Sequence, residues 1–121
     1  MFTYTEIQKF KKPLAEFWDP EVERCGIITA EGEIVEKTNR AADPARFFEF
    51  SIEDLEGAVA TWHTHPKSSA NLSIDDYRFF QSWENLTHYI VALTDVRCYL
   101  TSKGLVYLVD EEKDHPSRLP S

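Results

Sequence analysis

The chain has 121 residues, of which 42% are hydrophobic and 28% are charged, so it is long enough for one domain with its own apolar core. Its formal net charge of −8 at pH 7 disfavours binding to nucleic acid or to an anionic membrane surface, because both carry charge of the same sign. The two cysteines, Cys25 and Cys98, lack CxxC spacing, so we expect reduced, buried thiols. The N-terminus has no long apolar segment and no run approaches membrane-spanning length, which leads us to expect a cytoplasmic protein.

The predicted elements begin with a helix over residues 5–18, where apolar residues recur at helical spacing and Pro13 should bend or divide the helix. Strands are predicted over residues 23–29 and 33–37, joined as a hairpin by a turn at Glu31-Gly32. A loop over residues 39–44 then leads to a further predicted strand over residues 46–50.

Ser51 and Asp54 resemble a capping pair, which predicts a short helix over residues 52–56. The mostly apolar run 58–63 is typical of a central buried strand. A polar loop follows, and Ser73 can cap a helix that continues to about residue 83. The remaining predicted strands cover residues 89–94, 97–101 and 105–109, and the charged tail 110–121 should be exposed and mobile. These elements predict one domain over residues 1–109 with an α/β or α+β fold, a mixed β-sheet flanked by helices.

The stretch WHTHP over residues 62–66 places two of the four histidines on alternate positions. Alternate residues of a strand point to the same face, so His63 and His65 can direct both imidazoles at one point. Asp76, in the first turn of the following helix, can complete a set of two imidazoles and one carboxylate. Such a set suits Zn²⁺, and three protein ligands leave a fourth position for water, as in catalytic zinc sites.

Each of these residues also has an ordinary structural interpretation. The two histidines can be polar residues at the end of a strand, and Ser73 can serve as a helix cap alone. Asp75 and Asp76 can simply complement the helix dipole, and Asp75 is an alternative to Asp76 as a ligand.

The order His-x-His-Pro, six residues, then Ser-x-x-Asp resembles the signature of the JAMM metalloproteases, whose domain is also called MPN or JAB. The matching residues are His63, His65, Pro66, Ser73 and Asp76. The family also uses an upstream glutamate, commonly just ahead of a Cys-Gly pair, and Glu23 stands in that place before Cys25-Gly26. The stretch NRAADPARFFEF over residues 39–50 is similar to the prokaryotic branch, and within it to the protease domain of phage tail-assembly proteins.

This resemblance implies an MPN-like fold, similar in architecture to the cytidine deaminases, and a zinc-dependent peptidase or isopeptidase. It implies that His63, His65 and Asp76 bind Zn²⁺ and that Glu23 is the general base for a metal-activated water. Ser73 would donate a hydrogen bond to the oxyanion. The substrate would be a protein or peptide, for which a phage tail protein and a ubiquitin-like protein are both candidates, held as an added strand along the sheet edge near the metal.

Two other functions compete with a peptidase. A zinc deaminase carries His-x-Glu and a later Pro-Cys-x-x-Cys, whereas His65 stands in place of that glutamate and the sequence has no Cys-x-x-Cys. A non-catalytic JAB-fold binding or assembly module is the stronger alternative, because family members that have lost their ligands serve as scaffolds. The complete ligand set in this chain favours the enzyme. His88 and His115 lie outside the motif and are assigned no role.

Overall fold

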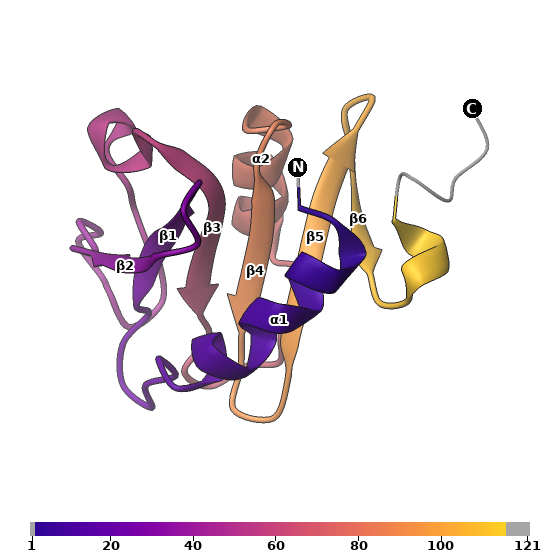
Figure 1. Cartoon of the computed structure of the whole chain (residues 1–121). Coiled ribbons are helices and arrows are strands. Elements are labelled where there is room, and N and C mark those ends of the chain that lie inside the picture. The colour runs from indigo at the N-terminus through magenta and orange to yellow at the C-terminus, as the bar shows by residue number, and fades with distance from the viewer. Residues whose placement is uncertain (1, 116–121) are drawn as a thin grey trace.

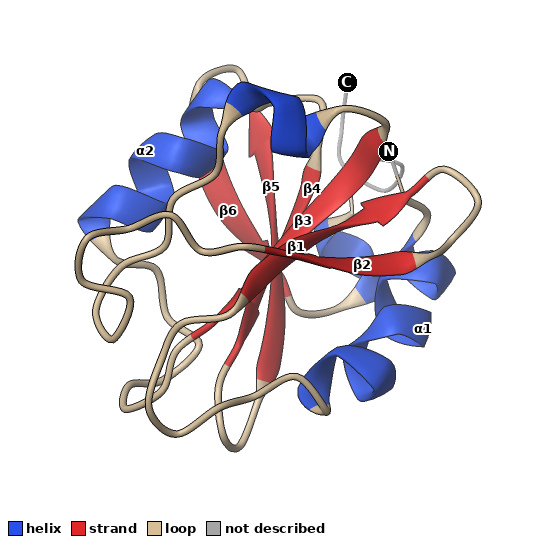
Figure 2. Cartoon of the chain, turned by 90° about the vertical axis from the view of Figure 1, so that its left-hand side faces the viewer, coloured by secondary structure: helices blue, strands red, loops and turns tan. Residues whose placement is uncertain are grey.

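The computed structural model, in which residues 2–115 are described, has a six-stranded mixed sheet with α-helices packed against it (Figure 1). Its elements are α1 (Tyr4–Ala15), β1 (Cys25–Thr29), β2 (Ile34–Lys37), η1 (Ile52–Leu55), β3 (Ala58–Thr64), α2 (Ile74–Ser82), β4 (Thr87–Val91), β5 (Val96–Ser102), β6 (Leu105–Val109) and η2 (Glu112–Asp114). The strand order is β2-β1-β3-β4-β5-β6; β3 and β4 are parallel, and the other neighbours are antiparallel. Helices α1 and α2 lie on opposite faces of the sheet, as Figure 2 shows. The predicted mixed sheet flanked by helices is confirmed.

Helix α1 begins at a capping box between Thr3 and Glu6. The Thr3 hydroxyl accepts the Glu6 N–H at 3.2 Å, and the Glu6 carboxylate accepts the Thr3 N–H at 3.0 Å. One face of the helix is buried through Ile7, Phe10 and Leu14, which follow helical spacing and pack toward β5. Pro13 was predicted to bend or divide the helix, and it does not divide it. It lies in the last turn, two residues before the helix ends, so little of the hydrogen-bond ladder remains to be broken.

Successive residues of the central strands contribute to two different cores, because side chains alternate across a strand. The core under α1 includes Ala60 and Trp62 of β3, whereas the core under α2 includes Phe80 and Ile90. Trp62 is fully buried, as predicted. The alternation therefore directs the next residue, His63, toward the α2 face, where the candidate site lies.

Gly26 makes room for Trp62 where the indole lies across the neighbouring strand β1. A Cβ atom on Gly26 would lie 2.6 Å from the Trp62 ring and 2.1 Å from the Val35 carbonyl oxygen, so a larger residue would displace backbone as well as the ring. The indole N–H also donates to the Ile27 carbonyl at 3.3 Å. The Cys-Gly pair after Glu23 therefore has a packing role next to the candidate site. Both Cys25 and Cys98 are free and buried, as predicted.

The predicted strand over residues 46–50 is wrong, since the structure gives this described segment no strand. The side chain of Asn39 takes the place of a neighbouring strand. Its amide donates to the Phe47 carbonyl at 2.9 Å and accepts the Glu49 N–H at 3.2 Å. Arg40 N–H completes the edge by donating to the Glu49 carbonyl at 3.2 Å. The segment is thus held as an irregular wall beside the sheet.

The other differences from prediction are at element ends. Strand β4 starts two residues earlier and ends three residues earlier than predicted, and the helix predicted over residues 52–56 is the 3₁₀ helix η1. The prediction of an exposed tail is wrong at His115, which is buried with Nε2 2.7 Å from the Phe2 carbonyl oxygen. Residues 116–121 lie outside the described residues. Within residues 2–115, no helix has the length and apolar character needed to cross a membrane.

His88 is buried between β3 and α2 as a neutral imidazole. Its Nε2 lies 3.0 Å from the Trp83 carbonyl oxygen, which can only accept, so Nε2 carries the proton and Nδ1 accepts the Thr61 hydroxyl at 2.7 Å. Burial lowers the pKa of His88 to about 4, because the charged ring would lose its hydration.

We predict that His88 lowers stability in acid. Between about pH 6.5 and 4 the unfolded state protonates His88 and the folded state does not, so the free energy of unfolding falls as pH falls. This contribution is on the order of 3 kcal/mol at pH 4. Urea unfolding of the wild type and the His88→Gln variant across this range measures it, since the other titrating groups cancel in the difference. Equal pH dependence of the two proteins would contradict the prediction.

Candidate metal centre

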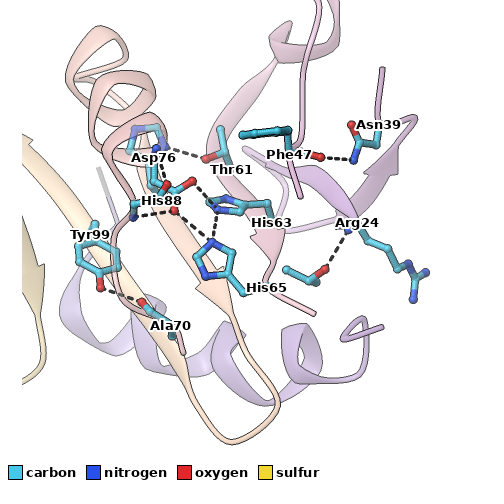
Figure 3. A network of polar contacts seen from close by, with 12 residues as sticks. Arg24, Asn39, Phe47, Thr61, His63, His65, Ala70, Asp76, His88 and Tyr99 are labelled. Atoms are coloured by element: carbon cyan, nitrogen blue, oxygen red, sulfur yellow. Dashed lines mark hydrogen bonds and ion pairs between the residues drawn. The ribbon is translucent and has the colours of Figure 1, made fainter. Parts of the chain in front are cut away.

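Two imidazoles and a carboxylate converge at the end of β3. His63 Nε2 lies 2.9 Å from Asp76 Oδ1, His65 Nε2 lies 3.1 Å from Asp76 Oδ2, and the two Nε2 atoms are 3.2 Å apart. All three side chains are buried, and Figure 3 shows them pointing toward one another. The structure thus brings together the three residues predicted to bind Zn²⁺.

Three local features place these side chains. His63 is the penultimate residue of β3, and His65 extends the parallel pairing by donating its N–H to the Val91 carbonyl at 2.8 Å. Asp76 lies in the first turn of α2, which Ser73 caps. The Ser73 hydroxyl accepts the Asp76 N–H at 3.0 Å, and Asp76 Oδ2 accepts the Ser73 N–H at 3.2 Å. The capping box that starts the helix therefore also fixes the Asp76 carboxylate, whereas Asp75 is exposed.

Glu23 is a second buried carboxyl at the same centre. Glu23, His63 and His65 offer ligand atoms that lie within 4.8 Å of one another. Hydrogen bonds hold the backbone of Glu23 on both sides. The Glu23 N–H donates to the Pro44 carbonyl at 2.7 Å, and the Glu23 carbonyl accepts a hydrogen bond from the Asn39 side-chain amide at 2.8 Å. Glu23 is therefore close enough to exchange a proton with a group bound at the histidines.

The hydrogen bonds of His65 show which kind of group fits this centre. Its Nδ1 lies 2.7 Å from the Ser69 carbonyl oxygen, so Nδ1 is protonated and the Nε2 of the neutral ring presents a lone pair. That lone pair faces the Asp76 carboxylate and the Nε2 of His63. Such an arrangement needs a proton or a cation among the three atoms. Ligand atoms in a tetrahedron around Zn²⁺ lie about 3.3 Å apart, close to the observed separations, so these residues fit zinc.

The ring of His63 is oriented by packing. Phe48 stacks on it with the ring centroids 4.0 Å apart and the planes at 20°, while its Nδ1 has no hydrogen-bond partner among the described residues. Burial lowers the pKa of His63, so this ring disfavours a proton. Burial also opposes a charge on His65, but the Asp76 carboxylate and the Ser69 carbonyl outweigh it and raise the pKa of His65. A bound cation would therefore compete with a proton mainly at His65.

Burial and neighbouring charges separate the two carboxyl groups. Burial opposes ionisation of Asp76, but His63 and His65 outweigh it and hold the pKa of Asp76 well below its ordinary value. Burial raises the pKa of Glu23 to about 8. The charge on Asp76 also raises this pKa, whereas His65 lowers it. Carboxyl groups whose pKa values are pushed apart are typical of sites in which one group remains charged and the other carries protons.

Three residues that hold the site were missed by sequence reasoning: Trp18, Phe48 and Ser69. The Trp18 indole donates to the His65 carbonyl at 3.0 Å from the segment after α1. The contacts of Trp18 and Phe48 join segments far apart in the sequence, so no local spacing identifies them, whereas Ser69 lies only four residues after His65. Thr64 faces away from the centre, as the alternation of a strand requires, and its hydroxyl accepts the Arg24 N–H at 2.9 Å.

A cavity of about 510 Å³ opens beside the centre. Glu23, His65, Ser73 and Asp76 form its polar wall. The lining also includes the aromatic residues Phe47, Phe50, Phe79 and Trp83. The centre can therefore be reached by a substrate.

No protein-family model matches the chain, and no curated protein sequence matches it. Among solved structures, the chain is similar to the solution structure of protein DSY2949 from Desulfitobacterium hafniense, with a TM-score of 0.56 and 18% sequence identity. The match covers 88% of this chain and 87% of that one. At this identity the likeness concerns the fold alone, and it agrees with the mixed sheet described above.

We predict that the protein binds one Zn²⁺ and that His63→Ala, His65→Ala and Asp76→Ala each weaken binding. The loss should exceed the roughly 10–100-fold cost of removing an outer-shell partner, because each variant removes a direct ligand. Competition with a chromogenic chelator at pH 7 measures the affinity. Asp75→Ala is the matched control, since it removes the neighbouring exposed carboxylate, and it should leave the affinity unchanged. An equal loss in Asp75→Ala and Asp76→Ala would show that the ligand set is wrong.

Proposed function

We propose that this protein is a JAMM-type zinc metallopeptidase or isopeptidase that hydrolyses an amide bond in a protein or peptide substrate. The proposal rests on one observation: three lone-pair ligands converge within 3.2 Å of one another, with a separately held, buried glutamic acid beside them. Metal-assisted hydrolysis requires one set of residues that holds the metal and another group that transfers the proton.

When bound, Zn²⁺ would supply an activated water and a Lewis acid for the substrate carbonyl. Glu23 would remove a proton from the attacking water and hold it, for which a pKa raised to about 8 by burial is suited. As the carbonyl carbon gains its bond to oxygen and the C–N bond breaks, Glu23 would return this proton to the leaving nitrogen. The products are a carboxylic acid and an amine, so no further reactant is needed.

In this proposal, Ser73 would stabilise the oxyanion. It is exposed and lines the cavity at the N-terminus of α2. Its oxygen already accepts the Asp76 N–H, and its hydroxyl hydrogen can still be donated to a substrate oxygen. A donor fixed in advance by a helix cap favours the transition state, because no reorganisation is needed when the charge develops.

The residues that match the JAMM signature support a protein substrate, with a phage tail protein and a ubiquitin-like protein as the candidates. A non-catalytic binding or assembly module on the same fold is the alternative. A scaffold has no need for a buried carboxyl with a raised pKa beside the ligands, since burying an ionisable group without a partner is costly. Glu23 therefore favours the enzyme.

We predict that Glu23→Gln abolishes cleavage while Zn²⁺ remains bound. Removing a general acid–base group should lower kcat by about 10²–10⁴-fold, because glutamine cannot carry the proton. Cleavage of a fluorescently labelled unfolded protein and of a lysine-linked isopeptide conjugate, with metal content measured in parallel, tests this.

Glu21→Gln is the control, since it changes an exposed carboxylate two residues away and should retain wild-type activity. If the zinc-loaded wild type and the Glu23→Gln variant show equal cleavage activity in every assay, the peptidase proposal is wrong and the non-catalytic binding module is the better interpretation.

A further inference from the structure

We propose that the cavity beside the metal centre is a side-chain pocket that selects substrates with a bulky apolar residue, aromatic above all, next to the scissile amide. The inference rests on the proposed peptidase function and names its substrate class. It excludes substrates in which glycine flanks the bond on both sides.

The size and position of the cavity support a pocket for a large side chain. Its volume of about 510 Å³ falls within the range of roughly 300–1,000 Å³ typical of sites that enclose organic groups. Glu23, His65 and Asp76 belong both to the centre and to the cavity wall. A peptide whose carbonyl reaches the centre therefore places an adjacent side chain at the cavity mouth.

One wall of the cavity is apolar. It is formed by Phe47, Phe50, Ile52, Leu55, Phe79 and Trp83. Phe47 is 48% exposed and Ile52 is 76% exposed. Single exposed apolar residues are common, but these two line the same cavity. A large apolar side chain would remove their surface from water, which glycine cannot do.

Ring contacts connect the aromatic wall to His63. Phe48 stacks on His63, and its ring meets those of Phe50 and Phe79 edge-on, with centroids 5.6 Å and 5.4 Å away. The Asn39 amide fixes the backbone between Phe47 and Glu49. The wall is thus formed before any ligand arrives, which reduces the ordering cost of binding.

The charged groups around the cavity are of both signs. Four carboxyl groups line it, those of Glu23, Glu49, Asp75 and Asp76. Two cations, Arg46 and Lys67, also line it, and Arg46 lies 3.9 Å from Asp43. The carboxyl groups and the cations offset one another, so the selectivity of the pocket rests on its apolar wall.

The first experiment measures binding without catalysis. Zinc-loaded, ¹⁵N-labelled Glu23→Gln protein is titrated with N-acetyl-phenylalanine amide and with N-acetyl-glycine amide and followed by NMR. The phenylalanine probe should bind at least tenfold more tightly than the glycine probe and shift the Trp83 indole N–H signal.

Variants of the cavity wall test the same point. Ile52→Glu and Phe47→Glu, each made in the Glu23→Gln background, should weaken binding of the phenylalanine probe at least tenfold. Leu93→Glu, which changes a residue that is 68% exposed and outside this cavity, should not. Equal binding of the two probes, or equal effects of Ile52→Glu and Leu93→Glu, would overturn the proposal.

The second experiment separates the pocket from the reaction. Wild-type enzyme is given quenched fluorescent peptides that carry glycine, leucine or phenylalanine on each side of the bond, and kcat/KM should be at least tenfold higher with the bulky residues on one side. If the probe binds as expected and no peptide is cleaved, the peptidase proposal fails and the pocket stands. If peptides are cleaved without preference and the probe does not bind, the pocket proposal fails and the peptidase stands.

Discussion

The contact between the Asp76 carboxylate and two buried imidazoles determines the geometry of the site. One oxygen meets each ring, at 2.9 Å for His63 and 3.1 Å for His65, so a single side chain ties the start of α2 to the end of β3. In a buried setting such charge interactions are strong, and removing one partner leaves the others unpaired at high cost. The Ser73 capping box holds the carboxylate from the other side. The same hydrogen bonds therefore start helix α2 and position the Asp76 carboxylate.

The sheet imposes the second constraint, because side chains of β3 must alternate between two covered faces. Trp62 fills the α1 side, and its bulk is accommodated only because Gly26 has no side chain. His63 then has to face α2, where Phe48 stacks against it. The packing on one face thus orients the proposed metal ligand His63 on the other, which links the core of the protein to the chemistry proposed for it.

The parts of the fold and site that could be predicted from sequence depend on neighbours along the chain. Strand alternation relates His63 to His65, and the cap relates Ser73 to Asp76, all within one short stretch. Glu23 is different, because spacing alone favours a solvated charge and only the family resemblance pointed to it. The predicted strand over residues 46–50 failed because the side chain of Asn39, in place of a neighbouring strand, takes up its backbone groups. The contacts of Trp18 and the cavity depend on segments that meet only in the folded chain, so no local pattern encodes them.

The two carboxyl groups could in principle exchange roles, since both lie near the imidazoles. Asp76 is held by hydrogen bonds and by both rings, and its pKa is far below the ordinary range, so it remains an anion and is a poor proton carrier. Burial raises the pKa of Glu23 to about 8, so Glu23 accepts a proton near neutral pH. Its ionised form is less stable than that of an exposed carboxylate, because burial removes its hydration. A constant anion is the better ligand for a cation, and a carboxyl that titrates near neutrality is the better base. In the proposed function, the environment of each group therefore suits Asp76 to binding the metal and Glu23 to carrying the proton.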